Sequence, residues 1–285
     1  MHSLTAFQAY DLREYDRAAD HAAAAATSLE ARKHELWWDM ACLRAECLLK
    51  LRRFSEAALI AEELLKELPA ALELLRARAH ALLAQCERGR GHLAEAVHHA
   101  REAVHAAAGL HSQSAMLLDS LAALIAVLTE AGELDEAWEH CHVLARLAET
   151  EPTSLTQGTA HAAIGNVAFL RGDHHEGAAR HHRAAEILSA TCDLAHWAEF
   201  NKSAAAARIR GGSIGPETAR MLSRAELAYS ATGRTKEDDL ELALLRTLLL
   251  NEALEASGQA EDGSPRARIV ERSRATSPQD PEGPD

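Results

Sequence analysis

The sequence predicts an all-α chain of about six helix–turn–helix repeats followed by a capping helix. A first observation is a recurring turn, in which a glycine is followed two residues later by an apolar or ring residue, as in Gly91–Leu93 and Gly132–Leu134. A second is its spacing, because the second residue of each turn falls at positions 15, 54, 93, 134, 174 and 214, in steps of 39 to 41. In the first two turns Arg13 and Arg52 take the place of the glycine. The composition, 47% apolar with only 4% aromatic, is typical of tightly packed helices with small contacts.

Small residues recur at fixed distances from each turn. Three residues after the turn residue come Ala18, Ala57, Ala96, Ala137 and Gly177. Nine residues before it come Ala45, Ala84, Gly165 and Ala205. Two helices can approach closely only where neither carries a bulky side chain. One such pair cannot bury its apolar face alone, so the repeats are expected to stack on one another.

The expected helices follow from this register. In chain order they pair 3–12 with 15–30, 33–51 with 54–67, 70–87 with 93–107, 112–130 with 134–149, 154–171 with 174–190, and 193–210 with 216–232. The range 15–30 is almost pure helix former. Gly172 is expected to end a helix because glycine enters a left-handed turn without a Cβ penalty. Pro216 fits a first helical turn, where its missing N–H costs nothing.

A last helix is expected at 236–257, as the cap of the array. An end unit needs a polar outer face, and we expect Arg246 and the acidic run 237–239 to supply it. Residues 258–285 are rich in Pro, Gly, Ser and mixed charge, which predicts a disordered tail. The expected domains are therefore a helical repeat domain over 1–257 and a tail over 258–285.

This pattern resembles the tetratricopeptide repeat, most closely in LRRFSEAALIAEELLKELP (51–69) and AIGNVAFLRGDHHEGAARHHRAAEIL (163–188). The resemblance covers about residues 3–232 and implies a right-handed α-solenoid. The chain departs from the family in its step near 40, where the usual step is roughly 34, and in its irregular sixth repeat. Long-period arrays of this kind also look like the C-terminal halves of actinobacterial transcription regulators and of peptide receptors of Gram-positive bacteria.

The resemblance also implies a binding site, because tetratricopeptide arrays usually bind ligands in a concave groove lined by the first helices. The places that match are Asp39, Glu46, Arg78, Gln85, Asn166, Phe169, Lys202 and Arg210. The centre is expected around Asn166, Phe169, Lys202 and Arg210. An amide both donates and accepts hydrogen bonds, and the two cations suit a carboxylate.

Charge and cysteine content restrict the partners. The formal charge of −13 argues against a phosphate-binding surface, so no direct nucleic-acid binding is expected. Five scattered cysteines without a CxxC pair, and no signal peptide, predict a cytoplasmic protein with reduced thiols. No apolar run approaches the length of a membrane span.

Catalytic chemistry is not expected. No GxSxG elbow, HExxH motif or other catalytic constellation occurs. The 17 histidines lack the convergent spacing of a zinc site. His21, His99 and His140 share one repeat position, which the resemblance places on the outer, solvated side. We therefore expect no enzyme, no metal and no cofactor.

Two functions remain. The first is a non-enzymatic interaction module that binds a peptide or a segment of a partner protein in its groove. The alternative is the ligand- or peptide-sensing domain of a bacterial transcription regulator, lacking or separated from its helix-turn-helix. Fold alone does not decide between them, and a homodimer stays open.

Overall fold

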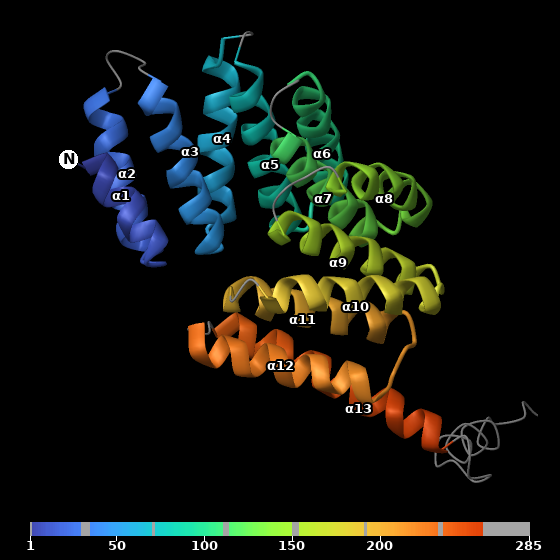
Figure 1. Cartoon of the computed structure of the whole chain (residues 1–285). Helices are drawn as coiled ribbons and strands as arrows, with labels where there is room; N and C mark the ends of the chain where they lie inside the picture. The colour runs from blue at the N-terminus through green and yellow to red at the C-terminus, as the bar shows by residue number, and fades with distance from the viewer. Residues whose placement is uncertain are drawn as a thin grey trace, which may run out of the picture. The chain divides into compact units, whose positions relative to one another are not determined.

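The computed structural model describes residues 2–29, 35–69, 72–110, 114–149, 154–190, 193–232 and 236–258. Over these ranges the chain forms thirteen helices and no strand, which confirms the predicted all-α fold (Figure 1). The helices are α1 (His2–Asp11), α2 (Tyr15–Leu29), α3 (Glu35–Lys50), α4 (Phe54–Glu67), α5 (Glu73–Arg90), α6 (Leu93–Ala108), α7 (Ser114–Ala131), α8 (Leu134–Ala148), α9 (Ser154–Leu170), α10 (His174–Ala190), α11 (Leu194–Arg210), α12 (Pro216–Thr232) and α13 (Lys236–Gly258).

The turns lie where the register predicts them. Gly172 adopts φ 82°, and its N–H and that of Asp173 donate to the carbonyls of Phe169 and Ala168, at 3.1 and 2.9 Å. These bonds satisfy two carbonyls that the end of α9 would otherwise leave unpaired. The first two turns lack glycine, and there Arg13 and Arg52 take the same left-handed conformation, with φ 61° and 58°.

The chain divides into two compact units, Met1–Asp193 and Leu194–Asp285. In unit 1, five hairpins follow one another, and each helix packs against the next along the chain. The first helices of successive hairpins also touch, α3 with α5, α5 with α7, and α7 with α9. Unit 1 thus has a layer of first helices and a layer of second helices.

Small residues form the contacts inside the hairpins, as predicted. Ala57, Ala96 and Ala137 are completely buried. At Gly165 an added Cβ would lie 2.3 Å from the ring of His181 on α10, so only glycine fits there. The core is therefore a row of alanine-rich clusters between neighbouring helices.

Unit 2 consists of one hairpin, α11 and α12, and the last helix α13, which contacts both. The cap is present, but its outer face differs from the prediction. Leu240 is 71% exposed and Leu254 is 67% exposed, so leucines occupy the face that was expected to be polar. The predicted tail, apart from Gly258, lies outside the described residues. Within the described ranges, no helix is both long and apolar enough to cross a membrane.

Candidate functional site

A polar cluster lies on the first helices of hairpins 2 and 3. Arg78 of α5 donates from Nε to Glu46 Oε1 at 2.9 Å, and its second nitrogen Nη2 lies 2.8 Å from the same oxygen. Its Nη1 lies 3.6 Å from Asp39 Oδ1. Both acids belong to α3, so the guanidinium links two successive first helices. Three of the predicted site residues therefore come together.

The cluster also changes the electrostatics of its neighbours. Burial, with Glu46 as a second cause, raises the pKa of Tyr10 on α1 to about 12. Burial of the Arg78 guanidinium works against its charge, yet Glu46 and Asp39 hold its pKa above the ordinary value. Burial raises the pKa of Cys42 to about 12, so this thiol stays protonated and unreactive at neutral pH.

The polar residues continue onto α7. Asp119 is exposed and makes no ion pair with another described residue. The protein nevertheless removes part of the water around its carboxyl, and this desolvation raises the pKa of Asp119. Arg88 of α5 lies 3.7 Å from Glu130 at the end of α7, and Gln85 lies half-buried on α5. Together these residues form the first-helix face, which consists of Asp39, Glu46, Arg78, Gln85, Arg88, Asp119 and Glu130.

Two predicted site residues are held inside hairpin 5. Asn166 Oδ1 lies 3.0 Å from Nε2 of His181, which is completely buried. Phe169 is 1% exposed, and its ring packs against His181, with 5.0 Å between ring centroids. The ring was expected to face a ligand, but it belongs to the core of the hairpin instead. Its repeat position faces inward here because Gly177 leaves a gap that the ring fills.

Lys202 is enclosed within unit 2 rather than offered to a ligand. Its Nζ lies 2.9 Å from Glu241, 3.1 Å from Glu199 and 3.7 Å from Asp238. It also lies 5.5 Å from the centre of the Tyr229 ring. Burial opposes its charge, but the carboxylates raise its pKa above the ordinary value.

Arg210 is exposed and makes no ion pair with any other described residue. Asn166 and Phe169 belong to unit 1, whereas Lys202 and Arg210 belong to unit 2. The four-residue centre predicted from the sequence is therefore not contained in either unit, and it stays a prediction. Pairing of Lys202 with Glu199 was the alternative interpretation of the sequence, and the structure adds Asp238 and Glu241 from the acidic start of α13.

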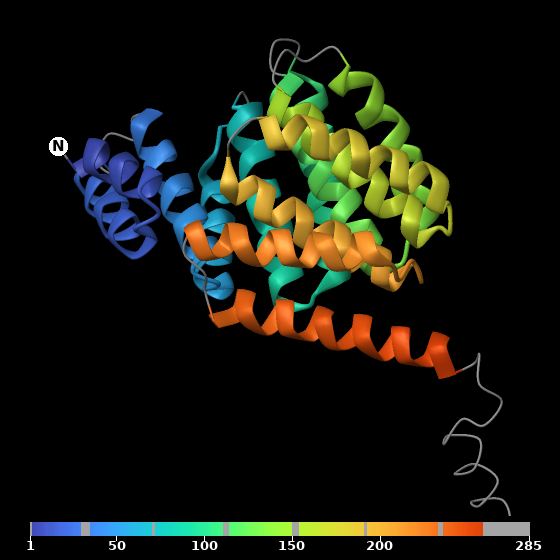
Figure 2. The same cartoon turned by 60° about the horizontal axis from the view of Figure 1, so that its bottom comes forward.

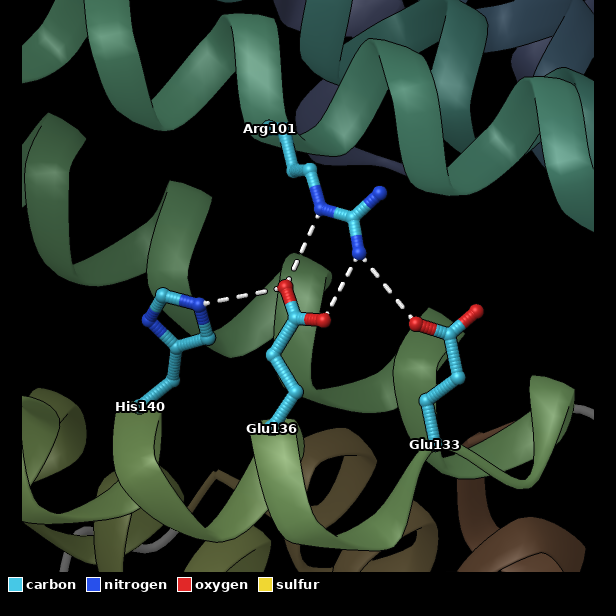
Figure 3. Close-up of polar contacts among 4 residues, drawn as sticks. All are labelled: Arg101, Glu133, Glu136 and His140. Atoms are coloured by element: carbon cyan, nitrogen blue, oxygen red, sulfur yellow. Dashed lines mark hydrogen bonds and ion pairs between the residues drawn. The ribbon is translucent and has the colours of Figure 1, made fainter.

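The second-helix layer carries its own arginine cluster (Figure 3). Arg101 of α6 donates from Nε and Nη2 to the two oxygens of Glu136 on α8, at 3.0 and 2.7 Å. Its Nη2 also donates to Glu133 at 3.2 Å, and His140 Nε2 lies 3.8 Å from Glu136. The hydrogen bonds from Arg101 lower the pKa of Glu136. This cluster links hairpins 3 and 4 on the layer opposite to Arg78.

The histidines at the shared repeat position are not simply solvated. His99 on α6 is half-buried, and its Nδ1 lies 3.2 Å from Nδ1 of His80 on α5. His21 makes the equivalent contact with His2 at 3.4 Å. Among the described residues, no group of three or more His, Cys, Asp or Glu side chains is arranged to hold a metal ion.

The chain was compared with known proteins. No model of a protein family matches it, and no curated protein matches its sequence. A Rap protein, crystallised in complex with competence and sporulation factor, matches with a TM-score of 0.61 at 13% identity, over 90% of this chain and 75% of that one. BtubC (BKLC) from P. vanneervenii matches with a TM-score of 0.59 at 15% identity, over 79% of this chain and 93% of that one. At such identities the likeness concerns the fold, and it supports an all-helical repeat protein.

Proposed function

We propose that the chain is a tetratricopeptide-like, non-enzymatic interaction module whose first-helix face binds a segment of a partner protein. The observation that carries this proposal is the Arg78 cluster, which holds polar groups from successive first helices at one surface. Arg78 is 28% exposed and Asp39 is 44% exposed, so both remain accessible while their geometry is fixed. Fixed polar groups cost less entropy on binding than mobile ones. We also place the protein in the cytoplasm, since its four described cysteines are buried free thiols.

The face indicates the chemistry of the segment. Between its polar residues lie Ala81, Ala122 and Ala126, all partly exposed, which let a backbone approach closely. Four carboxylates and two guanidinium groups occupy the face, so its net charge is negative. The partner segment should therefore carry Lys or Arg, with one cation opposite Asp119. Its backbone amides can pair with Gln85.

A second candidate is the sensing half of a bacterial regulator. The likeness to a Rap protein crystallised with a bound factor favours it. In that case a short peptide alone would bind as tightly as the whole partner. An interaction module would lose affinity when the partner is reduced to a peptide, because flanking contacts would be missing.

The test starts with the purified chain as bait in a lysate, followed by identification of the captured protein by mass spectrometry. Calorimetry then compares wild type with Asp119→Asn, which removes one charge from a residue without an ion pair. Loss of a charge-assisted hydrogen bond should weaken binding about tenfold or more. Arg101→Met is the matched control, because it removes an ion-paired arginine from the opposite layer. Equal affinity for wild type and Asp119→Asn, with weaker binding by Arg101→Met, would overturn the proposal.

A further inference from the structure

The last helix of unit 2, α13, occupies the position of the first helix of a further hairpin. Helix α13 contacts α11 and α12, as α9 contacts α7 and α8 in unit 1 (Figure 2). In unit 1 each first helix is then covered by the second helix of its own hairpin. No helix follows α13 in the described part of the chain, so its outer face has no such cover.

This outer face is apolar. The buried side of α13 carries Leu242 and Leu245, which are 2% and 9% exposed. On the other side lie the exposed leucines Leu240, Leu244, Leu250 and Leu254. At about 100° per residue these four fall within an arc of roughly 120°. Ala243 and the polar Thr247 and Asn251 lie between them on the same arc, so the patch is largely apolar. A largely apolar patch on an exposed helix face marks an interface in a water-soluble protein.

The leucines are spaced symmetrically along the helix. Leu244 and Leu250 lie three residues on either side of Thr247, and Leu240 and Leu254 lie seven residues on either side. Two copies of such a helix, placed antiparallel about a two-fold axis at Thr247, oppose leucine to leucine at every step. A two-fold interface requires this self-complementarity. We propose that α13 pairs with α13 of a second copy of this chain.

The size of the surface sets the strength of the pairing. A helix of 23 residues is about 34 Å long and its contact strip is about 10 Å wide, so each copy offers roughly 350 Å². The total lies below the ~1,200 Å² of a stable interface. The dimer is therefore weak and reversible.

Charge modulates this pairing. Six carboxylates and two cations lie on α13. Lys202 neutralises Asp238 and Glu241, and Arg246 pairs with Glu226 of α12. Asp239 and Glu255 lie eight residues on either side of Thr247, so an antiparallel pair brings these like charges opposite each other. Salt screens this repulsion, so added NaCl should tighten the dimer.

The first experiment is sedimentation velocity of the full chain between about 1 and 300 µM, a range over which a weak dimer forms and dissociates. The wild type should shift from 30.8 kDa toward twice that mass, and more readily at high salt. Leu244→Glu with Leu250→Glu should keep it monomeric. The matched control is Leu59→Glu with Leu227→Glu, because Leu59 on α4 has the same 59% exposure as Leu244. A wild type that stays monomeric, or equal loss of the dimer in both double variants, would overturn the pairing.

Cross-linking tests the axis itself. A residue on a two-fold axis faces its own copy, so Thr247→Cys should form a disulfide-linked dimer on mild oxidation. Ser230 on α12 is also exposed but lies off the proposed axis. Ser230→Cys should therefore form no disulfide-linked dimer. The wild-type chain, oxidised in the same way, is the control for disulfides formed by the native cysteines. Failure of Thr247→Cys to form a disulfide-linked dimer, or an equal yield from Ser230→Cys, would contradict the proposed axis.

Discussion

The ring of Phe169 on α9 packs directly on Gly177 of α10: a Cβ added to Gly177 would lie 2.6 Å from its Cδ2. No real Cβ sits so close to a ring, so Gly177→Ala must displace Phe169. We expect a loss of about 1–3 kcal/mol in the free energy of unfolding, measured by urea titration. Ala178→Leu, at the exposed neighbouring position, should change it by less than about 0.5 kcal/mol. Equal losses at the two positions would show that the hairpin does not pack as described.

Glycine should stabilise the first turn. Arg13 holds φ 61°, a conformation that costs a side chain roughly 1–2 kcal/mol. Arg13→Gly should therefore raise the free energy of unfolding by about 0.5–1 kcal/mol, and Gly172→Ala, at the same place in hairpin 5, should lower it by a similar amount. Arg52→Gly should gain less, because Arg52 also lies over the ring of Phe54 at 5.7 Å. A thermal shift of the same sign for Arg13→Gly and Gly172→Ala would refute this account of the turns.

Lys202 holds unit 2 together through acids on two helices. Lys202→Met would remove the cation that Glu199, Asp238 and Glu241 share. Since two of these acids are largely exposed, we expect a modest loss of about 1–3 kcal/mol. Hydrogen exchange should rise in α13, which depends on this contact, and stay unchanged in α3. Unchanged exchange in α13 would mean that its leucines alone hold the helix.

Hairpin 3 should weaken in acid. Burial, with His99 as a second cause, lowers the pKa of His80 to about 4. The pKa of His80 in the folded protein lies below the ordinary value of about 6.5, so the unfolded chain takes up this proton first as the pH falls. The contribution of neutral His80 to the free energy of unfolding is therefore complete above about pH 6.5 and is lost as the pH falls toward 4. The other charged groups near His80 are Arg76, His98 and Glu102, which do not change the sign.

The measurement for this acid effect is urea unfolding at pH 7 and pH 5. We expect a loss of about 1 kcal/mol on acidification, after allowing for the solvent around a half-exposed ring. His80→Leu should remove most of this difference. His142→Leu, which changes an exposed histidine of α8, should leave it intact. A pH dependence that survives His80→Leu would place the titrating group elsewhere.

The fold was predictable because its determinants are local and repeated. The 39-to-41-residue register depends only on turn residues and small residues, and every expected helix is present to within a few residues. The left-handed turn at Gly172 follows from the same logic. The register alone also located the first two turns, in which Arg13 and Arg52 stand in place of glycine.

The candidate site was only partly predictable, because exposure depends on packing that one sequence does not display. Arg78 meets Glu46 because both occupy ligand-facing places in successive repeats. Phe169 occupies such a place too, but the gap at Gly177 draws its ring into the core. Lys202 is enclosed because α13 brings two acids to it from 36 and 39 residues away.

The most direct test of the central claim is hydrogen exchange of the chain with and without its captured partner. Binding at the first-helix face predicts slower exchange in α3, α5 and α7, centred on the helical turns that carry Asp39, Arg78 and Asp119. Exchange in α6 and α8, which carry the Arg101 cluster, should change little. Protection confined to α6 and α8, with α3, α5 and α7 unaffected, would contradict the account.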